Sequence, residues 1–169
     1  MSTARSTGYS RNAKFVPAPR ATVYRAFLDP VALAAWLAPD DMTGTVHRMD
    51  ARIGGGYRMS LFYAADADGS RGKTADREDR FVARFVELSP PSRIVQAITF
   101  DSDDPSIAGE MSMVVTLETS GDGTEVVIEF HDIPPGIRPA DNEAGTRMSL
   151  EKLARYLADG GMGSDRAEG

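Results

Sequence analysis

The chain contains no cysteine, and this absence excludes two kinds of site at once. Neither a disulfide bond nor a thiolate metal centre can form anywhere in its 169 residues. Such a composition fits a reducing compartment, so we expect a cytoplasmic protein. Histidine is scarce as well. His47 and His131 are the only two, and they do not have the local spacing of a metal-binding pair. We therefore expect no metal ion and no other cofactor.

Long apolar runs and an excess of positive charge are missing as well. No segment approaches the roughly 18 apolar residues of a transmembrane helix, so we expect no membrane span. The formal net charge is −6, whereas a nucleic-acid binder needs a basic surface for the phosphates. We therefore expect no nucleic-acid partner. Residues 1–12 lack the apolar core of a secretory signal.

Motifs for covalent, phosphate or calcium chemistry do not stand out either. There is no G-x-S-x-G sequence. Gly54–Gly56 lacks the strand-to-helix context of a phosphate loop, so we expect a structural turn there. Asp66–Gly69 resembles the start of a calcium loop, but Arg77 stands where the final ligand should be. The acidic run Asp101–Asp104 is interpreted as a solvated loop rather than a cation site.

We expect one domain over residues 13–159, between disordered tails at 1–12 and 160–169, which are polar and rich in small or charged residues. A chain of this length can bury its own core. Apolar and polar residues alternate in several segments, which predicts antiparallel strands with one packed face. The expected strands are Lys14–Val16, Thr43–Arg52, Tyr57–Ala64, Arg80–Leu88, Ile94–Phe100, Glu110–Glu118 and Thr124–His131.

Three helices are expected around this sheet. The first follows Ala18-Pro19, and the second begins at Asp29-Pro30, where Asp29 can cap the helix and Pro30 suits its first position. The third, Pro139–Asp159, is long and amphipathic and ends near Gly160. Its apolar stripe runs through Thr146, Leu150, Leu153 and Leu157.

Together these patterns predict an α+β fold of the helix-grip kind, in which a curved antiparallel sheet of six or seven strands wraps around a long C-terminal helix. Two short N-terminal helices complete it. A single helix only partly fills a strongly curved sheet. The remaining space is either packed by large side chains or left as a cavity, and both alternatives stay open at this point.

The order and spacing of several short segments resemble the Hsp90-ATPase-activator C-terminal-domain-like (AHSA1-like) family, within the START/Bet v 1-like superfamily. The resemblance extends from about Lys14 to Asp159. The residues and segments that carry it are Ala18-Pro19, Val23, Asp29-Pro30, Leu33, Trp36, Gly54–Tyr57, Val86–Pro91, Arg93–Val95, Gly123–Val126, Asp141–Gly145 and Ser149–Leu153.

The resemblance implies the helix-grip fold and a cavity between the sheet and the long helix. Two departures bear on function. The family's usual Gly-Trp near the final helix is Gly145-Thr146 here, which implies a differently shaped cavity mouth. The chain also lacks the second domain of the eukaryotic co-chaperone that gives the family its name, so stimulation of Hsp90 is not expected.

Large or polar residues on the expected inner face form the candidate ligand site. Phenylalanine and methionine can line an adaptable apolar cavity, while Tyr57 and Gln96 would need hydrogen-bond partners from protein, water or ligand. Trp36 is either a gate of the cavity or an anchor of the core. The candidate residues are Trp36, Tyr57, Met59, Phe81, Phe85, Gln96, Phe100, Met111, Met113, Phe130 and Met148.

The leading hypothesis is therefore a cytoplasmic domain that binds a small hydrophobic molecule. One alternative is an enzyme similar to polyketide cyclases or hydrolases, which would need an acid or base inside the cavity. Another is a protein-interaction module that contacts a chaperone or the product of a neighbouring gene. An exposed apolar patch on the outer face of the sheet or at Ile133–Ile137 would favour it. Formation of a homodimer is left open.

Overall fold

The computed structural model describes residues 8–39, 42–63 and 78–162. The loop expected at Ala65–Asp79, with its Asp66–Gly69 motif, lies mostly outside these residues, as do the ends of both expected tails. The seven strands are β1 (Gly8–Val16), β2 (Thr43–Asp50), β3 (Gly56–Phe62), β4 (Glu78–Ser89), β5 (Arg93–Phe100), β6 (Glu110–Ser120) and β7 (Gly123–Ile133). The helices are α1 (Arg20–Ala26), α2 (Pro30–Trp36) and α3 (Pro139–Ala158), with a short 3₁₀ helix at Pro105–Ile107.

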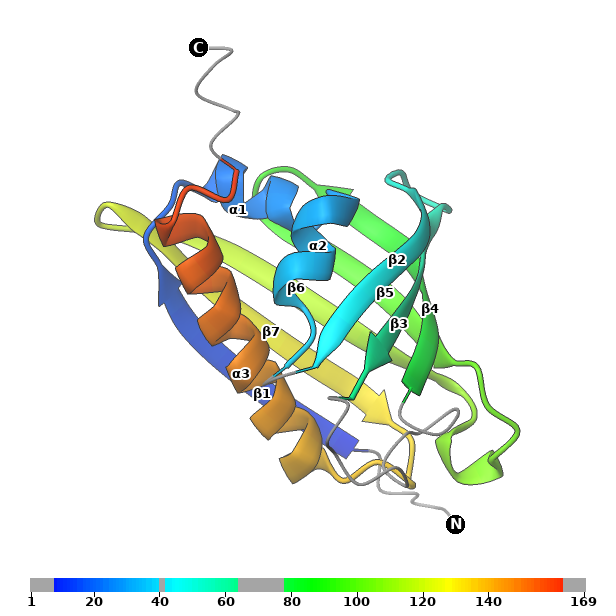
Figure 1. Ribbon diagram of the computed structural model, residues 1–169. Helices are drawn as coiled ribbons and strands as arrows, with labels where there is room; N and C mark the ends of the chain where they lie inside the picture. Colours follow the sequence, from blue (N-terminus) through cyan, green and yellow to red (C-terminus); the bar gives the residue numbers. More distant parts are fainter. Residues whose placement is uncertain (1–7, 40–41, 64–77, 163–169) are drawn as a thin grey trace.

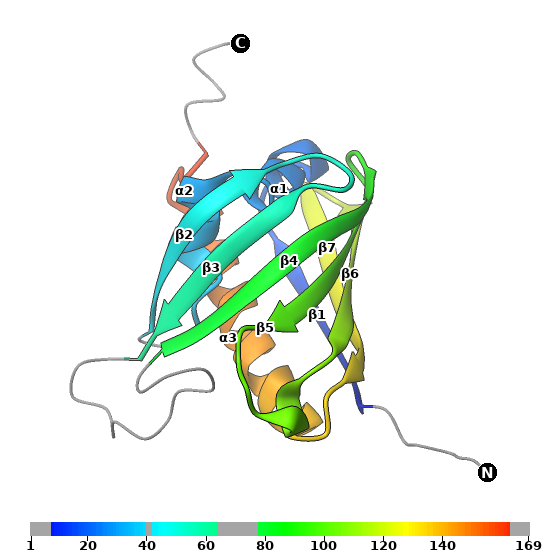
Figure 2. The same ribbon diagram turned by 90° about the vertical axis from the view of Figure 1, so that its right-hand side faces the viewer.

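All seven strands form one antiparallel sheet in the order β1-β7-β6-β5-β4-β3-β2. The sheet curves around α3, and α1 and α2 lie near the C-terminal end of that helix (Figure 1). Turned by 90°, the molecule shows β2, β3 and β4 in front of the helices (Figure 2). The α+β helix-grip fold is therefore confirmed, with seven strands and three main helices.

Side-chain alternation explains which face of the sheet is buried. In β6, the side chains of Met111, Met113, Val115 and Leu117 are buried, whereas those between them are half-buried. The stripe of α3 closes the core from the other side, because Thr146, Leu150, Leu153 and Leu157 are all buried. The helix ends where Gly160 takes a positive φ of 85°.

Bulges help to bend the sheet. The register of β2 against β3 shifts between Val46 and Arg48, and that of β4 against β5 shifts between Phe85 and Glu87. An extra residue at such a position bends the strand and increases its twist. The shift also explains why Val46 and Met49, which are three residues apart, both pack against the core.

The glycine run between β2 and β3 is a structural turn, as expected. Gly54 has a φ of 88°, and the amide of Gly54 donates a 2.9 Å hydrogen bond to the main-chain oxygen of Phe85. A Cβ atom on Gly56 would lie only 1.9 Å from the main-chain oxygen of Ala83. Close approach of two strands therefore accounts for the glycine at this position.

The first strand is longer than the predicted Lys14–Val16. Strand β1 already begins at Gly8 and pairs with β7 along its length. Residues 8–12 are mostly polar and do not show the alternation typical of a strand, but they form hydrogen bonds with neighbouring elements. The Ser10 hydroxyl donates to the side-chain oxygen of Asn142, and the Asn12 amide donates to the main-chain oxygen of Glu143.

Candidate functional site

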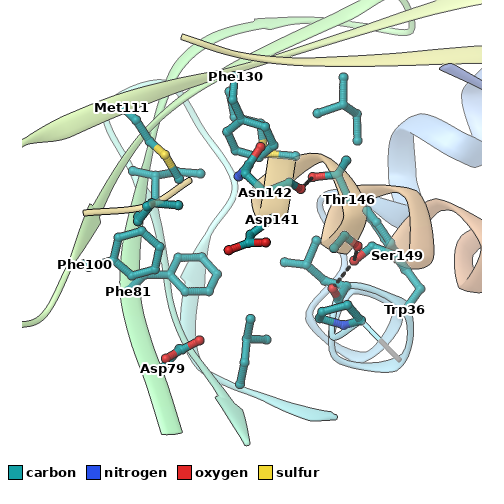
Figure 3. A pocket seen from close by; sticks show the side chains of 18 of the residues that line it. Trp36, Asp79, Phe81, Phe100, Met111, Phe130, Asp141, Asn142, Thr146 and Ser149 are labelled. Carbon is teal, nitrogen blue, oxygen red and sulfur yellow. Dashed lines mark hydrogen bonds between the residues drawn. The ribbon is translucent and has the colours of Figure 1, made fainter. Parts of the chain in front are cut away.

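A pocket of about 190 Å³ lies between the N-terminal half of α3 and the inner face of the sheet. Figure 3 shows the two walls from close by, with Phe81, Phe100 and Met111 on the sheet side and Thr146 and Ser149 on α3. The pocket is lined by Trp36, Leu37, Pro39, Tyr57, Leu61, Asp79, Phe81, Ile98, Phe100, Met111, Met113, Ile128, Phe130, Ile137, Asp141, Asn142, Gly145, Thr146 and Ser149.

The wall formed by the sheet is apolar and aromatic. Phe81 and Phe100 are direct cross-strand partners, with ring centroids 6.1 Å apart. The ring of Tyr57 meets that of Phe81 edge-on at 6.0 Å. Aromatic pairs in these arrangements stabilise a strand pair beyond the area that they bury. The wall of the pocket on this side is thus built from packed aromatic rings.

The wall formed by α3 is small and polar. Asn142, Thr146 and Ser149 follow at helical spacing and face the sheet together with Gly145. The hydroxyl of Thr146 donates a 2.8 Å hydrogen bond to the main-chain oxygen of Asn142. Gly145 contributes no side chain, and a Cβ atom there would meet only Pro39, at 3.9 Å. This glycine therefore leaves room beside the helix.

Trp36 lines the pocket from the end of α2 and is fully buried. Its indole Nε1 donates a 3.0 Å hydrogen bond to the main-chain oxygen of Ala26. Its ring packs edge-on against Phe27, with centroids 4.8 Å apart. Contacts of this kind hold the indole in place, so Trp36 anchors the core and offers one fixed side to the pocket.

Two carboxylates of the pocket were missed by the sequence reasoning. Asp79 is only 2% exposed and accepts a 3.0 Å hydrogen bond from the Tyr63 hydroxyl. It lies two residues before Phe81 in β4, so alternation places it on the same face; the predicted strand began one residue too late to include it. Asp141 lies on α3 near the mouth, 3.8 Å from the Arg138 guanidinium, and its side chain is 71% exposed.

A buried polar pair lies at the inner end of the pocket. The Tyr57 hydroxyl donates a 3.0 Å hydrogen bond to Oε1 of Gln96, and both residues are buried. Burial raises the pKa of the Tyr57 phenol well above its ordinary value, because the anion would lose its hydration. Tyr57 therefore stays protonated at neutral pH and acts as a hydrogen-bond donor rather than a base.

Seven of the eleven predicted site residues line the pocket: Trp36, Tyr57, Phe81, Phe100, Met111, Met113 and Phe130. Met59, Phe85 and Gln96 lie on the same inner face but do not line the pocket, and each is almost completely buried. Met148 is half-buried, because its neighbours Thr146 and Ser149 take the helix face that points to the pocket. Alternation with a period of two predicts which side chains point to the inner face of the sheet. It does not predict which of these side chains line the pocket.

The two histidines and Asp104 do not line this pocket. His47 contacts the Ser60 hydroxyl at 2.9 Å, and His131 lies against the ring of Tyr9. Among the residues that the structure describes, no cluster of acidic or histidine side chains could hold a metal ion. Asp104 caps the 3₁₀ helix, and its pKa is lowered by hydrogen bonds from the backbone amide and the hydroxyl of Ser106.

Two further features bear on partners. Ile133 and Ile137 are both buried, so this segment does not form the apolar surface patch that would favour a protein-interaction module. Within the described ranges 8–39, 42–63 and 78–162, no helix is both long and apolar enough to cross a membrane.

Comparison with known proteins gives a match to one family model. The model described as Activator of Hsp90 ATPase homolog 1-like protein matches residues 17–158. No match was found among curated proteins. Among solved structures, the chain is similar to protein CV1439 from Chromobacterium violaceum, with 34% sequence identity and a TM-score of 0.77. The match covers 88% of this chain and 96% of that one.

Two more distant structures share the fold. An AHSA1-like protein from Aeromonas hydrophila is 22% identical, with a TM-score of 0.68 over 90% of this chain and 94% of that one. DynU16, a protein of the dynemicin biosynthetic locus, is 24% identical, with a TM-score of 0.64. That match covers 92% of this chain and 49% of DynU16.

Proposed function

Because the chain belongs to the Activator of Hsp90 ATPase homolog 1-like family, we propose that it is a small-molecule-binding domain that holds a hydrophobic ligand between α3 and the sheet. One observation carries the proposal: the pocket has an aromatic wall on one side and a small polar wall on the other. The single helix over a curved sheet leaves this space, and Gly145 keeps it open on the helix side. A cysteine-free chain is compatible with a cytoplasmic location.

The pocket's size limits the ligand. A dry engineered cavity of about 150 Å³ holds one benzene molecule, so a pocket of about 190 Å³ suits one ring with a short substituent. Pockets for drug-sized ligands begin at about 300 Å³. The ligand is therefore either small or buries one ring-sized end while the rest extends past Asn142 and Asp141 at the mouth.

The expected affinity follows from the buried area. Burying one phenyl-sized group stabilises a complex by about 1.5–3 kcal/mol, whereas a dissociation constant of 1 mM corresponds to about 4 kcal/mol. A ring alone should thus bind only at high concentration. A screen for ligands should therefore use probes at millimolar concentration and should include larger molecules that carry a ring at one end.

The experiment compares the parent protein with two variants at position 145. Gly145→Phe should fill the pocket, whereas Gly145→Ala adds a single methyl group that has room beside Pro39. We expect small ring compounds to raise the melting temperature of the parent and of Gly145→Ala, but not of Gly145→Phe. Native mass spectrometry should show the same order of binding.

The proposal fails if no compound of a ring-bearing library binds the parent protein. It also fails if Gly145→Phe binds the same compounds with unchanged affinity, because the ligand would then occupy another part of the molecule. Folding of both variants is checked by circular dichroism before binding is measured.

A further inference from the structure

Gln96 is a polar side chain in the middle of an apolar layer. It lies on β5 opposite Met113 of β6 and Phe85 of β4, and it is 1% exposed. Among the residues that the structure describes, its side chain makes one hydrogen bond, in which Oε1 accepts from the Tyr57 hydroxyl at 3.0 Å. Among the described residues, Nε2 of Gln96 has no hydrogen-bond partner.

The imbalance does not depend on which way the amide is turned. Gln96 and Tyr57 together carry three donor hydrogens, two on the amide and one on the hydroxyl. The single hydrogen bond between them uses one of the three. If the amide oxygen and nitrogen exchanged places, the bond would reverse its direction, and two donor hydrogens would still lack an acceptor.

Such a group costs the fold free energy. A buried donor without an acceptor is unfavourable by about 1–3 kcal/mol, and buried polar groups in proteins nearly always have partners. An apolar residue of similar size would remove the penalty, and the neighbours Phe85 and Met113 show that apolar side chains fit this layer. The amide is thus a polar group that the packing of the core does not require.

Gln96 does not line the pocket itself, but three of its neighbours do. Its hydrogen-bond partner Tyr57 and its cross-strand neighbour Met113 both line the pocket, as does Ile98, the next inward residue of β5. Directly opposite side chains on adjacent strands have Cβ atoms about 5 Å apart. Met113 is the only side chain of the three that is both unbranched and flexible, so it can turn and expose the amide.

We propose that the buried end of the ligand carries a carbonyl or hydroxyl oxygen, which accepts a hydrogen bond from Nε2 of Gln96 when Met113 turns aside. The inference rests on the proposed function and adds the chemical class of the ligand. That ligand is a ring compound with a carbonyl or hydroxyl group rather than a plain hydrocarbon. A site with an unpaired buried donor discriminates against ligands that lack the acceptor, because the donor then stays unpaired.

Two probes of equal shape test the inference. Acetophenone and α-methylstyrene differ in having a carbonyl oxygen or a methylene group on the same carbon. We expect the parent protein to bind acetophenone at least tenfold more tightly by titration calorimetry or ligand-observed NMR. Gln96→Met, which keeps the volume but removes the amide, should lose this preference. Tyr57→Phe, which keeps the amide, should retain it.

A second measurement does not depend on a variant's binding affinity. In a ¹⁵N-labelled sample, the side-chain amide signal of Gln96, assigned as the one missing in Gln96→Met, should shift with acetophenone and not with α-methylstyrene. Equal affinities for both probes, or a preference that survives in Gln96→Met, would overturn the inference while leaving the pocket proposal intact. If neither probe binds although other ring compounds do, the inference is also wrong. If no ring compound binds at all, the pocket proposal fails with it.

Discussion

The hydroxyl of Ser149, in the middle of α3, donates a 2.6 Å hydrogen bond to the main-chain oxygen of Leu37, the residue directly after α2. The same hydroxyl lies 3.1 Å from the main-chain oxygen of Gly145. Lys152, one turn further along α3, donates a 2.6 Å hydrogen bond to the main-chain oxygen of Ala38. Two side chains of α3 thus hold the segment that leads from α2 to the pocket.

Removing the Ser149 hydroxyl should weaken this connection. Ser149→Ala leaves the Leu37 oxygen without that donor, and we expect the free energy of unfolding to fall by about 1 kcal/mol. Urea denaturation measures the change. Ser112→Ala, on the wetter face of β6, is the control and should alter stability by less than half as much. Equal effects of the two substitutions would contradict the assigned role.

Gly145→Ala should stabilise the protein. Glycine inside a helix costs about 1 kcal/mol relative to alanine, and a Cβ atom at this position meets nothing closer than 3.9 Å. We expect a gain of about that size in the free energy of unfolding, measured by thermal denaturation. A loss of stability would mean that this part of the helix is packed more tightly than the structure indicates.

Asp29 should contribute a measurable cap to α2. Its Oδ1 accepts hydrogen bonds of 2.9 and 3.0 Å from the amides of Val31 and Ala32. Loss of an N-cap side chain typically costs about 1 kcal/mol, so Asp29→Ala should lower stability by that amount. Asp29→Ser keeps an acceptor and should recover most of it, and chemical denaturation of the three proteins gives the comparison.

Ionisation of Tyr57 should destabilise the fold in alkaline solution. Burial raises its pKa in the folded state above the ordinary value of about 10. Below about pH 10 the phenol is protonated in both the folded and the unfolded state, so its contribution to the free energy of unfolding is fully present. Above that pH only the unfolded chain loses the proton, and stability falls by up to about 1.4 kcal/mol for each pH unit.

The variant Tyr57→Phe isolates this effect. Its free energy of unfolding should fall less steeply between pH 10 and 11 than that of the parent. Equal slopes in the two proteins would show that the Tyr57 phenol is reached by solvent in the folded state. Tyr156→Phe, at a half-exposed position, is the control and should change the slope less.

Arg48 and Arg58 form a like-charged pair on the outer face of the sheet. They are direct cross-strand partners in β2 and β3, and both are exposed. Opposite charges in this arrangement stabilise a sheet by about 0.2–1 kcal/mol, whereas like charges destabilise it. Arg58→Glu should therefore raise stability at low salt, and the gain should shrink in 1 M salt. Arg58→Gln, which removes only the repulsion, should give a smaller gain.

Local signals in the sequence predicted some elements well. The pair Asp29-Pro30 correctly predicted where α2 begins. The Asp29 cap and the fixed φ of Pro30 both act within the first turn of the helix. The strict alternation from Met111 to Leu117 likewise gives the buried face of β6. In both cases the residues that determine the structure lie next to one another in the sequence.

Features that depend on distant neighbours were harder to predict. The first five residues of β1 are polar or small, apart from Tyr9, and become a strand only because β7 and α3 supply partners. Gln96 and Phe85 alternate with their neighbours as pocket residues would, yet both are buried in the core and neither lines the pocket. Asp79 was missed because the start of β4 is unremarkable in sequence and its burial depends on tertiary packing.

The pairing of β1 with β7 has a consequence for synthesis on the ribosome. Strand β1 leaves the ribosome long before its partner β7, since Gly8 pairs with Ile133 and Val16 with Thr124. Contacts between such remote segments slow folding and leave edges uncovered meanwhile. Nascent chains halted before residue 123 should therefore carry an unmatched first strand, which a chaperone or a neighbouring chain could capture.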